Sequence, residues 1–275
     1  MKKTITIPAV LNVLLKILML CVFLFPFYWM IISGMKTLQE TIQFPPTLWP
    51  REIQWQNYVK VWQSGPYGLY TMNSIVVSIA VLVLQVIIMV PASYAFAKYN
   101  FKGQGILFGI VMVAFMIPTQ VTFISIYSMM SRWKLLRTLW PQIIPMGANA
   151  FGIFLLRQSF KQIPDELLES ARLDNANEFQ VMMKVMLPMG MPTLISIMML
   201  SFIGTWNNYF WPLIMSTTQN VYPLTIGIAA LRDVEGSFDW EIIMAGNTIL
   251  VLPIMIVYAL FHKRIVRAFA YSGIK

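Results

Sequence analysis

Six long apolar stretches constrain the fold of this chain more than any other feature of its sequence. A helix that crosses a lipid bilayer needs about 20 predominantly apolar residues. Stretches of at least that length lie at about 11–33, 71–97, 104–130, 138–160, 193–216 and 242–262. Only 11% of the 275 residues are charged, whereas a soluble domain carries about 25%. We therefore predict an all-α, polytopic membrane helix bundle with about six transmembrane helices, formed by residues 1–275 as a single domain.

The lysines and arginines between these stretches predict the orientation of the chain, because basic residues are enriched in cytoplasmic loops. With the N-terminus inside, twelve Lys and Arg residues lie on the cytoplasmic side and seven on the opposite side, while Lys16 falls inside the first span. The loop at 131–138, with three basic residues, runs against this rule. We expect a multi-pass protein of the cytoplasmic membrane, embedded in the lipid bilayer, with both termini in the cytoplasm.

The composition disfavours several classes of function. The net charge of +9 reflects basic residues that flank the spans, and no basic cluster with interleaved aromatic residues indicates nucleic acid as a partner. Cys21 is the only cysteine and His262 the only histidine, so we expect no metal site, no catalytic residues and no cofactor on this chain. A membrane enzyme would need a catalytic acid, base or metal site near the bilayer, and it is disfavoured for the same reason.

The eleven acidic residues bear on how transport could be driven. All of them lie outside the predicted spans, with Glu241 in an external loop just before the last span. Proton- and sodium-coupled carriers usually keep an ionisable group at membrane depth, although some sodium sites use only carbonyl and hydroxyl oxygens. An ion-coupled secondary carrier is therefore disfavoured. The chain also lacks the phosphate-binding loop Gly-x-x-x-x-Gly-Lys-Ser/Thr, so any ATP would have to bind to another subunit.

The cytoplasmic loop at 161–190 begins with the pattern of a short helix. Pro164 suits the first turn, where its missing N–H costs nothing, and Asp165 follows at the positive end of the helix dipole. Asn175 suits the end of the helix, because asparagine tolerates the left-handed conformation. The apolar residues expected to share one face by their spacing are Leu167, Leu168 and Ala171.

A second helix is expected directly after the first. Asn177, with Gln180 three residues later, has the pattern of a capping box. Pro188 is expected to end this helix, with Leu187 before it outside the helical region. Two short helices with exposed apolar faces suit either a docking element for a partner or helices that lie on lipid, and the pattern leaves both open. The apolar residues of the second helix at helical spacing are Phe179, Met182, Met183 and Met186.

The residues of this loop resemble the signature of the permease subunits of ATP-binding-cassette importers. That signature is Glu-Ala-Ala-x-x-x-Gly followed, after nine residues, by Ile-x-Leu-Pro. Serine replaces an alanine here, asparagine replaces the glycine and valine replaces the isoleucine. The likeness covers nearly the whole chain and is greatest to the six-span partner in maltose-type carbohydrate systems. The matching residues include Asn57-Tyr58, Met72-Asn73-Ser74, Glu169-Ser170-Ala171, Asn175, Val185-Met186-Leu187-Pro188, Trp206-Asn207-Asn208, Trp211-Pro212-Leu213 and Gly273-Ile274-Lys275.

The resemblance implies the type I importer permease fold and a division of tasks among subunits. This chain would form half of the pathway for a carbohydrate delivered by an extracytoplasmic solute-binding protein, beside a second permease subunit. ATP and magnesium would bind to a pair of separate ATP-binding subunits. A vitamin-type importer, whose loop signature differs, is an alternative of the same class. The loop at 161–190 would be the coupling loop, which contacts the ATP-binding subunits. Its contact residues would be Glu169, Ser170, Ala171, Asp174, Asn175, Leu187 and Pro188.

Polar and aromatic residues inside the spans are candidates for the substrate pathway. Neutral amides can hydrogen-bond to sugar hydroxyls, and aromatic rings can stack on the apolar faces of a sugar. Amides also bridge transmembrane helices, so hydrogen bonding between helices is their alternative role. No Lys or Arg lies deep in a predicted span, which favours a neutral sugar, with glycerol phosphate or another polyol-like solute as the alternative. The candidates are Asn73, Gln120, Asn149, Trp206, Asn207, Asn208 and Tyr209.

Prolines lie inside several of the predicted spans. Each of them can free backbone groups and bend its helix, which could serve gating or simply shape the bundle. The prolines concerned are Pro91, Pro118, Pro141, Pro145, Pro212 and Pro253.

Overall fold

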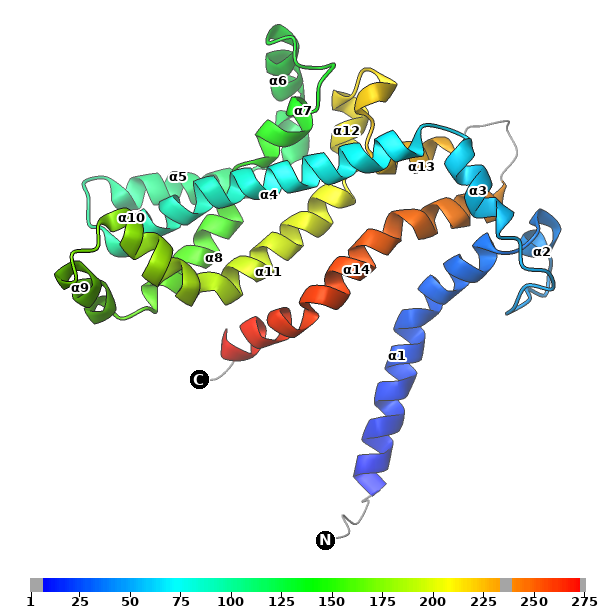
Figure 1. Ribbon diagram of the computed structural model, residues 1–275, viewed down its shortest axis with the longest axis horizontal. Helices are drawn as coiled ribbons and strands as arrows, with labels where there is room; N and C mark the ends of the chain where they lie inside the picture. Colours follow the sequence, from blue (N-terminus) through cyan, green and yellow to red (C-terminus); the bar gives the residue numbers. More distant parts are fainter. Residues whose placement is uncertain (1–6, 233–238, 273–275) are drawn as a thin grey trace. The chain divides into compact units, whose positions relative to one another are not determined.

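The computed structural model describes residues 7–232 and 239–272 (Figure 1). Within these ranges the chain is built of helices and contains no strand. It divides into two compact units, the described parts of 1–68 with 227–253 and of 69–226 with 254–275. The single permease domain expected from the sequence stays a prediction. The C-terminal residues Gly273-Ile274-Lys275, which contribute to the family resemblance, lie outside the described residues.

Most of the helices follow one another with short connections, whereas residues 43–55 form a longer one between α2 and α3. In order, they are α1 (Ile7–Gly34), α2 (Leu38–Ile42), α3 (Gln56–Gln63), α4 (Tyr67–Lys98), α5 (Gln104–Met116), α6 (Thr119–Arg132), α7 (Trp140–Ile143), α8 (Ala150–Lys161), α9 (Asp165–Leu173), α10 (Glu178–Val181), α11 (Leu187–Trp206), α12 (Phe210–Met215), α13 (Leu224–Ala230) and α14 (Trp240–Ser272). Short 3-10 turns lie at Ile144–Met146 (η1) and Gln219–Val221 (η3), and a π-helical turn at Met182–Met186 (η2).

Four helical stretches in the described chain are long and apolar enough to cross a bilayer without a break. Three of them agree closely with the predicted spans at 11–33, 71–97 and 242–262, and the fourth overlaps the predicted span at 193–216. A helix needs such a length because a bilayer presents about 30 Å of hydrocarbon. The four stretches are Leu11–Gly34, Tyr67–Lys98, Glu178–Trp206 and Trp240–Phe261.

The predicted span at 104–130 is not one straight helix. α5 and α6 differ in direction by 98° across the break at Ile117 and Pro118. Pro118 has φ of −63° and ψ of 132°, which is extended backbone, and its ring removes the N–H that would continue the hydrogen bonds of α5. By length and composition the described chain therefore has four membrane-crossing helices, or five if this pair counts as one, where the sequence predicted about six.

The predicted spans at 138–160 and 193–216 are also interrupted. The first is divided into α7, with Pro141 in its first turn, η1, which contains Pro145, and α8, which has only 12 residues. A helix of that length reaches about 18 Å. The second breaks after Trp206, while its unbroken helical part begins as early as Glu178. Apolar composition indicates burial or contact with lipid, but it does not report the direction of the backbone.

Glu241 lies in the first turn of α14 and not in an external loop, so the predicted position is wrong. The residue is only 8% exposed, and its Oε2 has no hydrogen-bond partner in the part of the chain that the structure describes. An acidic residue suits the first turn of a helix, because the N-terminal end of the helix dipole is positive. Glu178 likewise begins an apolar helical stretch. The distribution of acidic residues is thus a weaker argument against ion-coupled transport than the sequence suggested.

In the first unit, a buried polar cluster folds the segment that follows α1. Lys36 is 1% exposed; its Nζ donates to the carbonyl of Thr47 and lies 4.5 Å from the ring centroid of Trp29. Burial lowers the pKa of Lys36, an effect that the nearby Glu40 carboxylate opposes. Glu40 in turn accepts hydrogen bonds from Thr47 Oγ1 at 2.8 Å and from the Arg51 amide at 3.1 Å. These buried contacts hold the segment that follows α1 in a defined conformation.

In the second unit, the core lies where α4, α8 and α11 pack together. Residues of α9, α10 and η2 belong to the same buried cluster, so the helices of the loop at 161–190 pack against the long ones. Figure 1 shows α9 and α10 at the end of α4 that lies away from α12. The buried members of the core are Met89, Val90, Tyr94, Ile153, Leu156, Phe160, Ile163, Leu168, Val181, Met182, Met186, Leu194 and Ile197.

Candidate coupling site

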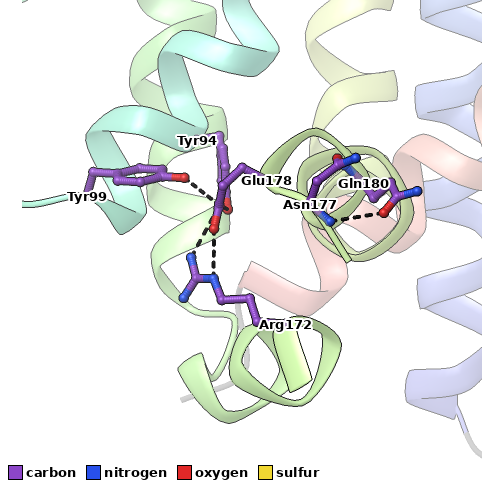
Figure 2. A network of polar contacts seen from close by, with 6 residues as sticks. All are labelled: Tyr94, Tyr99, Arg172, Asn177, Glu178 and Gln180. Carbon is purple, nitrogen blue, oxygen red and sulfur yellow. Dashed lines mark hydrogen bonds and ion pairs between the residues drawn. The ribbon is translucent and has the colours of Figure 1, made fainter. Parts of the chain in front are cut away.

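The loop at 161–190 contains the short helix α9 and the start of a second helix, α10, and both begin close to where the sequence predicts. α9 begins after Pro164 and has two acidic residues in its first turn. Asn175 has φ of 62°, the left-handed conformation that commonly ends a helix. Asn177 Oδ1 accepts a hydrogen bond from the backbone N–H of Gln180 at 2.9 Å. Gln180 Oε1 accepts one from the backbone N–H of Asn177 at 3.0 Å (Figure 2). The predicted capping box is therefore confirmed.

The predicted end of the second helix at Pro188 is wrong. Leu187 has φ of −63° and ψ of −47°, which is helical, and Pro188 lies in the first turn of α11. A proline cannot donate to the carbonyl four residues before it, and its ring clashes with that carbonyl. The π-helical turn η2, directly before Leu187, widens the backbone at this place and accommodates the proline. The second helix therefore runs on without a break as the apolar stretch Glu178–Trp206.

The apolar residues of the two short helices divide between a buried and an exposed side. The predicted shared face of Leu167, Leu168 and Ala171 is wrong for Leu167, because Leu168 is buried while Leu167 points outward. Val181 and Met186 are fully buried in the core of the second unit. We call the exposed apolar residues the coupling ridge; they are Leu167, Leu173, Phe179 and Met183, with exposed fractions of 41%, 84%, 67% and 40%.

Most of the residues predicted to contact an ATP-binding subunit are accessible. Ala171 and Leu187 are half-buried and pack against the core, so they help to seat the helices. Ser170 Oγ donates only to the nearby carbonyl of Leu167, at 3.0 Å. Glu169 takes part in neither of the ion pairs found among the described residues. The exposed members of the predicted set are Glu169, Ser170, Asp174, Asn175 and Pro188.

Glu178 is the centre of a polar network that the sequence did not reveal (Figure 2). Its carboxylate accepts from Arg172 Nε at 2.8 Å and from Arg172 Nη2 at 3.3 Å. It also accepts from the hydroxyl of Tyr94, at 2.7 Å, and from the hydroxyl of Tyr99. The hydrogen bonds with Glu178 raise the pKa of the Arg172 guanidinium above its ordinary value, so this group stays charged. One carboxylate thus joins α9, α10 and the C-terminal end of α4.

Lys98 makes a second connection between α4 and the start of α9. Its side chain is 6% exposed, and its Nζ donates to the Ile163 carbonyl and to Asp165 Oδ1, each at 2.6 Å. These partners are 65 and 67 residues away along the chain. Such a contact leaves no local pattern, so the sequence indicated only that Lys98 is a cytoplasmic basic residue.

Two of the predicted pathway amides are occupied by hydrogen bonds within the second unit. Asn73 is buried, and its Nδ2 donates to the carbonyls of Asn220 at 2.9 Å and Tyr222 at 3.0 Å. Asn149 caps α8 through its Oδ1, and its Nδ2 donates to Ser201 Oγ at 3.0 Å. These hydrogen bonds are of the kind that was the alternative to substrate contact, and a role of both residues in the substrate pathway stays a prediction.

Among the described residues, the other pathway candidates differ in burial and in position along the helices. Gln120 is exposed in the first turn of α6, and Trp206 is 3% exposed at the end of α11. Asn208 lines a cavity of about 10 Å³, together with residues that include Ser74, Gln142 and Thr205. A cavity of that volume holds at most about one water molecule. The remaining two candidates, Asn207 and Tyr209, are exposed.

A comparison with known families decides what kind of protein carries this loop. The family of binding-protein-dependent transport system inner membrane components matches residues 87–271, which contain the whole coupling loop. The chain belongs to this family. It is therefore the permease component of an ATP-binding-cassette importer and not a catalytic subunit, as the signature of the loop predicted.

Individual relatives cover nearly the whole chain. The probable ABC transporter permease YurM of Bacillus subtilis is 31% identical and aligns with 91% of this chain and 83% of its own length. The arabinooligosaccharide permease AraQ of Halalkalibacterium halodurans is 28% identical over 91% of each chain. The sn-glycerol-3-phosphate permease UgpE of Pectobacterium atrosepticum is 29% identical over 90% of this chain and 91% of its own.

A solved structure confirms the fold class of this permease. It belongs to a bacterial ABC transporter involved in the import of the acidic polysaccharide alginate. The match has a TM-score of 0.82 and 23% sequence identity, and it covers 96% of this chain and 98% of the other. The all-α importer permease fold predicted from the sequence is therefore confirmed, and the chain is a multi-pass membrane protein.

Proposed function

We propose that this permease conducts a carbohydrate and that its coupling loop docks onto a separate ATP-binding subunit. Two relatives and the structural neighbour carry names that refer to arabinooligosaccharides, sn-glycerol 3-phosphate and alginate, all of which are polyhydroxylated solutes. Arg157 lies near the end of α8, but its Nε donates to the Phe96 carbonyl at 3.0 Å and its guanidinium lies 4.1 Å from the centroid of the Phe108 ring. Since that cation is already engaged, a neutral sugar is the favoured substrate.

The single observation that carries the docking proposal is the coupling ridge. Leu173 and Phe179 are 84% and 67% exposed, although the opposite side of the same helices is packed into the core. Exposed apolar side chains on a well-packed element are typical of a protein interface. Glu169 and Asp174 lie on the same short helix segment and are exposed. Carboxylates there disfavour the alternative of helices lying on lipid, because the cytoplasmic leaflet carries negative charge.

The proposed transporter contains more than this chain. A second permease would complete the pathway, which is consistent with the occupied amides of Asn73 and Asn149. A pair of ATP-binding subunits would hold ATP and magnesium, and an extracytoplasmic solute-binding protein would deliver the sugar, in keeping with the family description. The coupling loop and both termini would lie in the cytoplasm of a cell whose cytoplasmic membrane holds the complex.

Affinity purification from native membranes in mild detergent tests the docking proposal. We expect the wild-type permease to bring down a second permease and an ATP-binding subunit. Glu169→Lys and Leu173→Ser should lose the ATP-binding subunit but keep the second permease, because one reverses a charge and the other removes an exposed anchor. Leu48→Ser is the matched control, since Leu48 is 63% exposed and lies outside the coupling loop. Normal recovery of the ATP-binding subunit with both coupling variants would contradict the proposal.

A phosphorylated polyol is the second candidate substrate, and one surface feature favours it. Arg132 lines a groove of about 520 Å³ with Ser125 and Ser128, and Lys134 and Arg137 line a neighbouring groove of about 370 Å³. Guanidinium and ammonium groups beside hydroxyls suit a phosphate ester. Competition for uptake between a neutral disaccharide and sn-glycerol 3-phosphate separates the two candidates. Inhibition by the phosphate ester alone would overturn the neutral-sugar proposal.

A further inference from the structure

The C-terminal end of α4 holds both short helices of the coupling loop. Lys98 binds the start of α9 through the Ile163 carbonyl and the Asp165 carboxylate. Tyr94 and Tyr99 bind the first residue of α10 through the carboxylate of Glu178 (Figure 2). An ATP-binding subunit could dock onto the coupling ridge without any of these contacts. The proposed docking therefore does not explain why they are present. We call this set of contacts the α4 latch; its members are Tyr94, Lys98, Tyr99, Ile163, Asp165, Arg172 and Glu178.

The side-chain bonds of the α4 latch all involve a charged carboxylate, except the one from Lys98 to the Ile163 carbonyl. Those of Arg172 and Lys98 join a cation to a carboxylate, and those of the two tyrosines join a hydroxyl to a carboxylate. Charge-assisted hydrogen bonds are roughly twice as strong as neutral ones. Arg172 lies on α9 and Glu178 on α10, so the same network also ties the two short helices to each other. A displacement of α9 and α10 therefore moves the end of α4 with them, unless several such bonds break together.

The opposite end of α4 is fixed to a different segment of the second unit. Asn73 donates to the carbonyls of Asn220 and Tyr222, and the Leu224 amide donates to Ser74 Oγ at 2.8 Å. Asn73 and Ser74 are 6% and 4% exposed, so these bonds are shielded from water. With a rise of about 1.5 Å per residue, the stretch from Asn73 to Lys98 is about 38 Å long. One helix thus connects the coupling loop with the segment at 219–224.

Packing against neighbouring helices supports α4 between its two attached ends. Pro91 lies inside the helix and removes one backbone hydrogen bond. Next to it, Met89 and Val90 are buried in the core of the second unit. Ser93 is also buried, and its Oγ donates to the Ile153 carbonyl at 3.1 Å. The packing with α8 therefore supports the helix at its weakest point.

We propose that α4 carries the displacement of the coupling helices to the segment at 219–224, with Glu178 and Lys98 as positioning residues of the α4 latch. This inference rests on the proposed docking of an ATP-binding subunit onto the coupling ridge. A transmitting element must be stiff and must be attached at both ends, and its role requires evidence of energetic coupling between those ends. The two attached ends of α4 make that coupling measurable.

The test compares ATP hydrolysis with transport in the complete reconstituted transporter. The double variant Tyr94→Phe/Tyr99→Phe removes the two hydroxyls that bind Glu178 and leaves the coupling ridge intact. We expect it to keep the ATP-binding subunit and to hydrolyse ATP, while the number of sugar molecules taken up per ATP falls several-fold. Tyr127→Phe is the matched control, because Tyr127 lies on α6, outside the latch. Normal uptake per ATP in the double variant would overturn the inference.

A variant at the far end of α4 makes the test independent of local damage to the latch. Ser74→Ala removes the acceptor of the Leu224 amide and should also lower uptake per ATP. The triple variant combines Tyr94→Phe/Tyr99→Phe with Ser74→Ala. If both ends act through one helix, its uptake per ATP should be no lower than that of the more severe parent, because the effects of coupled sites are not additive. Additive losses would overturn the inference. Loss of the ATP-binding subunit from the wild-type complex would instead refute the proposed docking, so the two failures are distinguishable.

Discussion

Asn175 is the residue on which the geometry of the coupling loop depends most directly. Its φ of 62° lies in the left-handed region, which costs most residues about 1–2 kcal/mol. We expect Asn175→Val to lower the thermal unfolding temperature of the purified permease and to weaken recovery of the ATP-binding subunit. Asn175→Gly is the control and should behave at least as well as the wild type, since glycine adopts this conformation freely. Equal unfolding temperatures for the valine and glycine variants would contradict this interpretation.

In the first unit, Gly34 is a residue whose replacement the structure should not tolerate, because there is no space for a side chain. A Cβ at this position would lie 2.9 Å from the Ala245 backbone nitrogen and 3.0 Å from its Cα, which are atoms that cannot move aside as a side chain can. We expect Gly34→Ala to destabilise the permease by about 1–3 kcal/mol, the usual cost of overpacking. Denaturant unfolding in detergent, followed by tryptophan fluorescence, measures the change.

Gly109 provides the control for that measurement. A Cβ at Gly109 would meet no atom within 4 Å. Gly109→Ala should therefore leave stability unchanged or raise it slightly, because alanine is the better helix former. If the two alanine variants unfold at the same denaturant concentration, the close approach of α1 and α14 at Gly34 is not a determinant of stability.

Among single residues, the sequence predicted those conformations and hydrogen bonds that depend on neighbours along the chain. The left-handed Asn175 and the capping box of Asn177 and Gln180 follow from local backbone chemistry, and both are present. Tyr94 and Lys98 were missed as latch residues, because their partners lie 84 and 65 to 67 residues away. A single sequence carries no signal for a contact of that range, so only the folded chain reveals it.

At the scale of single helices, the capping box at the start of α10 can be tested by substitution. Asn177→Ala removes the acceptor for the Gln180 amide and should lower the free energy of unfolding by about 1 kcal/mol. The unfolding temperature of the purified permease reports this loss. Gln158→Ala, at an exposed position of α8, is the matched control and should have little effect. A larger effect of Gln158→Ala than of Asn177→Ala would show that the cap does not stabilise the loop.

The prolines explain where the prediction of helices succeeded and where it failed. Pro118 ends α5 and the chain turns by 98°, whereas Pro188 is accommodated in a continuous helix. The difference lies in η2, a π-helical turn that the sequence gives no means to foresee. The apolar stretches at 104–130 and 138–160 have the composition of spans, but hydropathy reports only the surroundings of a segment and not its direction. The number of helices was therefore less predictable than the fold class.

For the whole molecule, the predicted orientation leads to a labelling experiment. Cys21 is the only cysteine, so Cys21→Ser gives a background without thiols. In that background, Gln39→Cys in α2 should react in intact cells with a maleimide that cannot cross the membrane. Asn100→Cys, between α4 and α5, should react only after the membrane is permeabilised. Both positions are exposed, so a reversed pattern would mean that the termini and the coupling loop face outward.

The central claim is that ATP on another subunit drives a sugar through a pathway of which this chain forms half. Uptake of labelled sugar into proteoliposomes tests it most directly, using the purified complex with ATP at the cytoplasmic face and loaded binding protein at the other. We predict uptake that requires ATP and the binding protein, persists without any ion gradient and is lost with Glu169→Lys. Uptake by the isolated chain on a proton or sodium gradient, without ATP, would contradict the claim and would assign Glu241 a role in ion coupling.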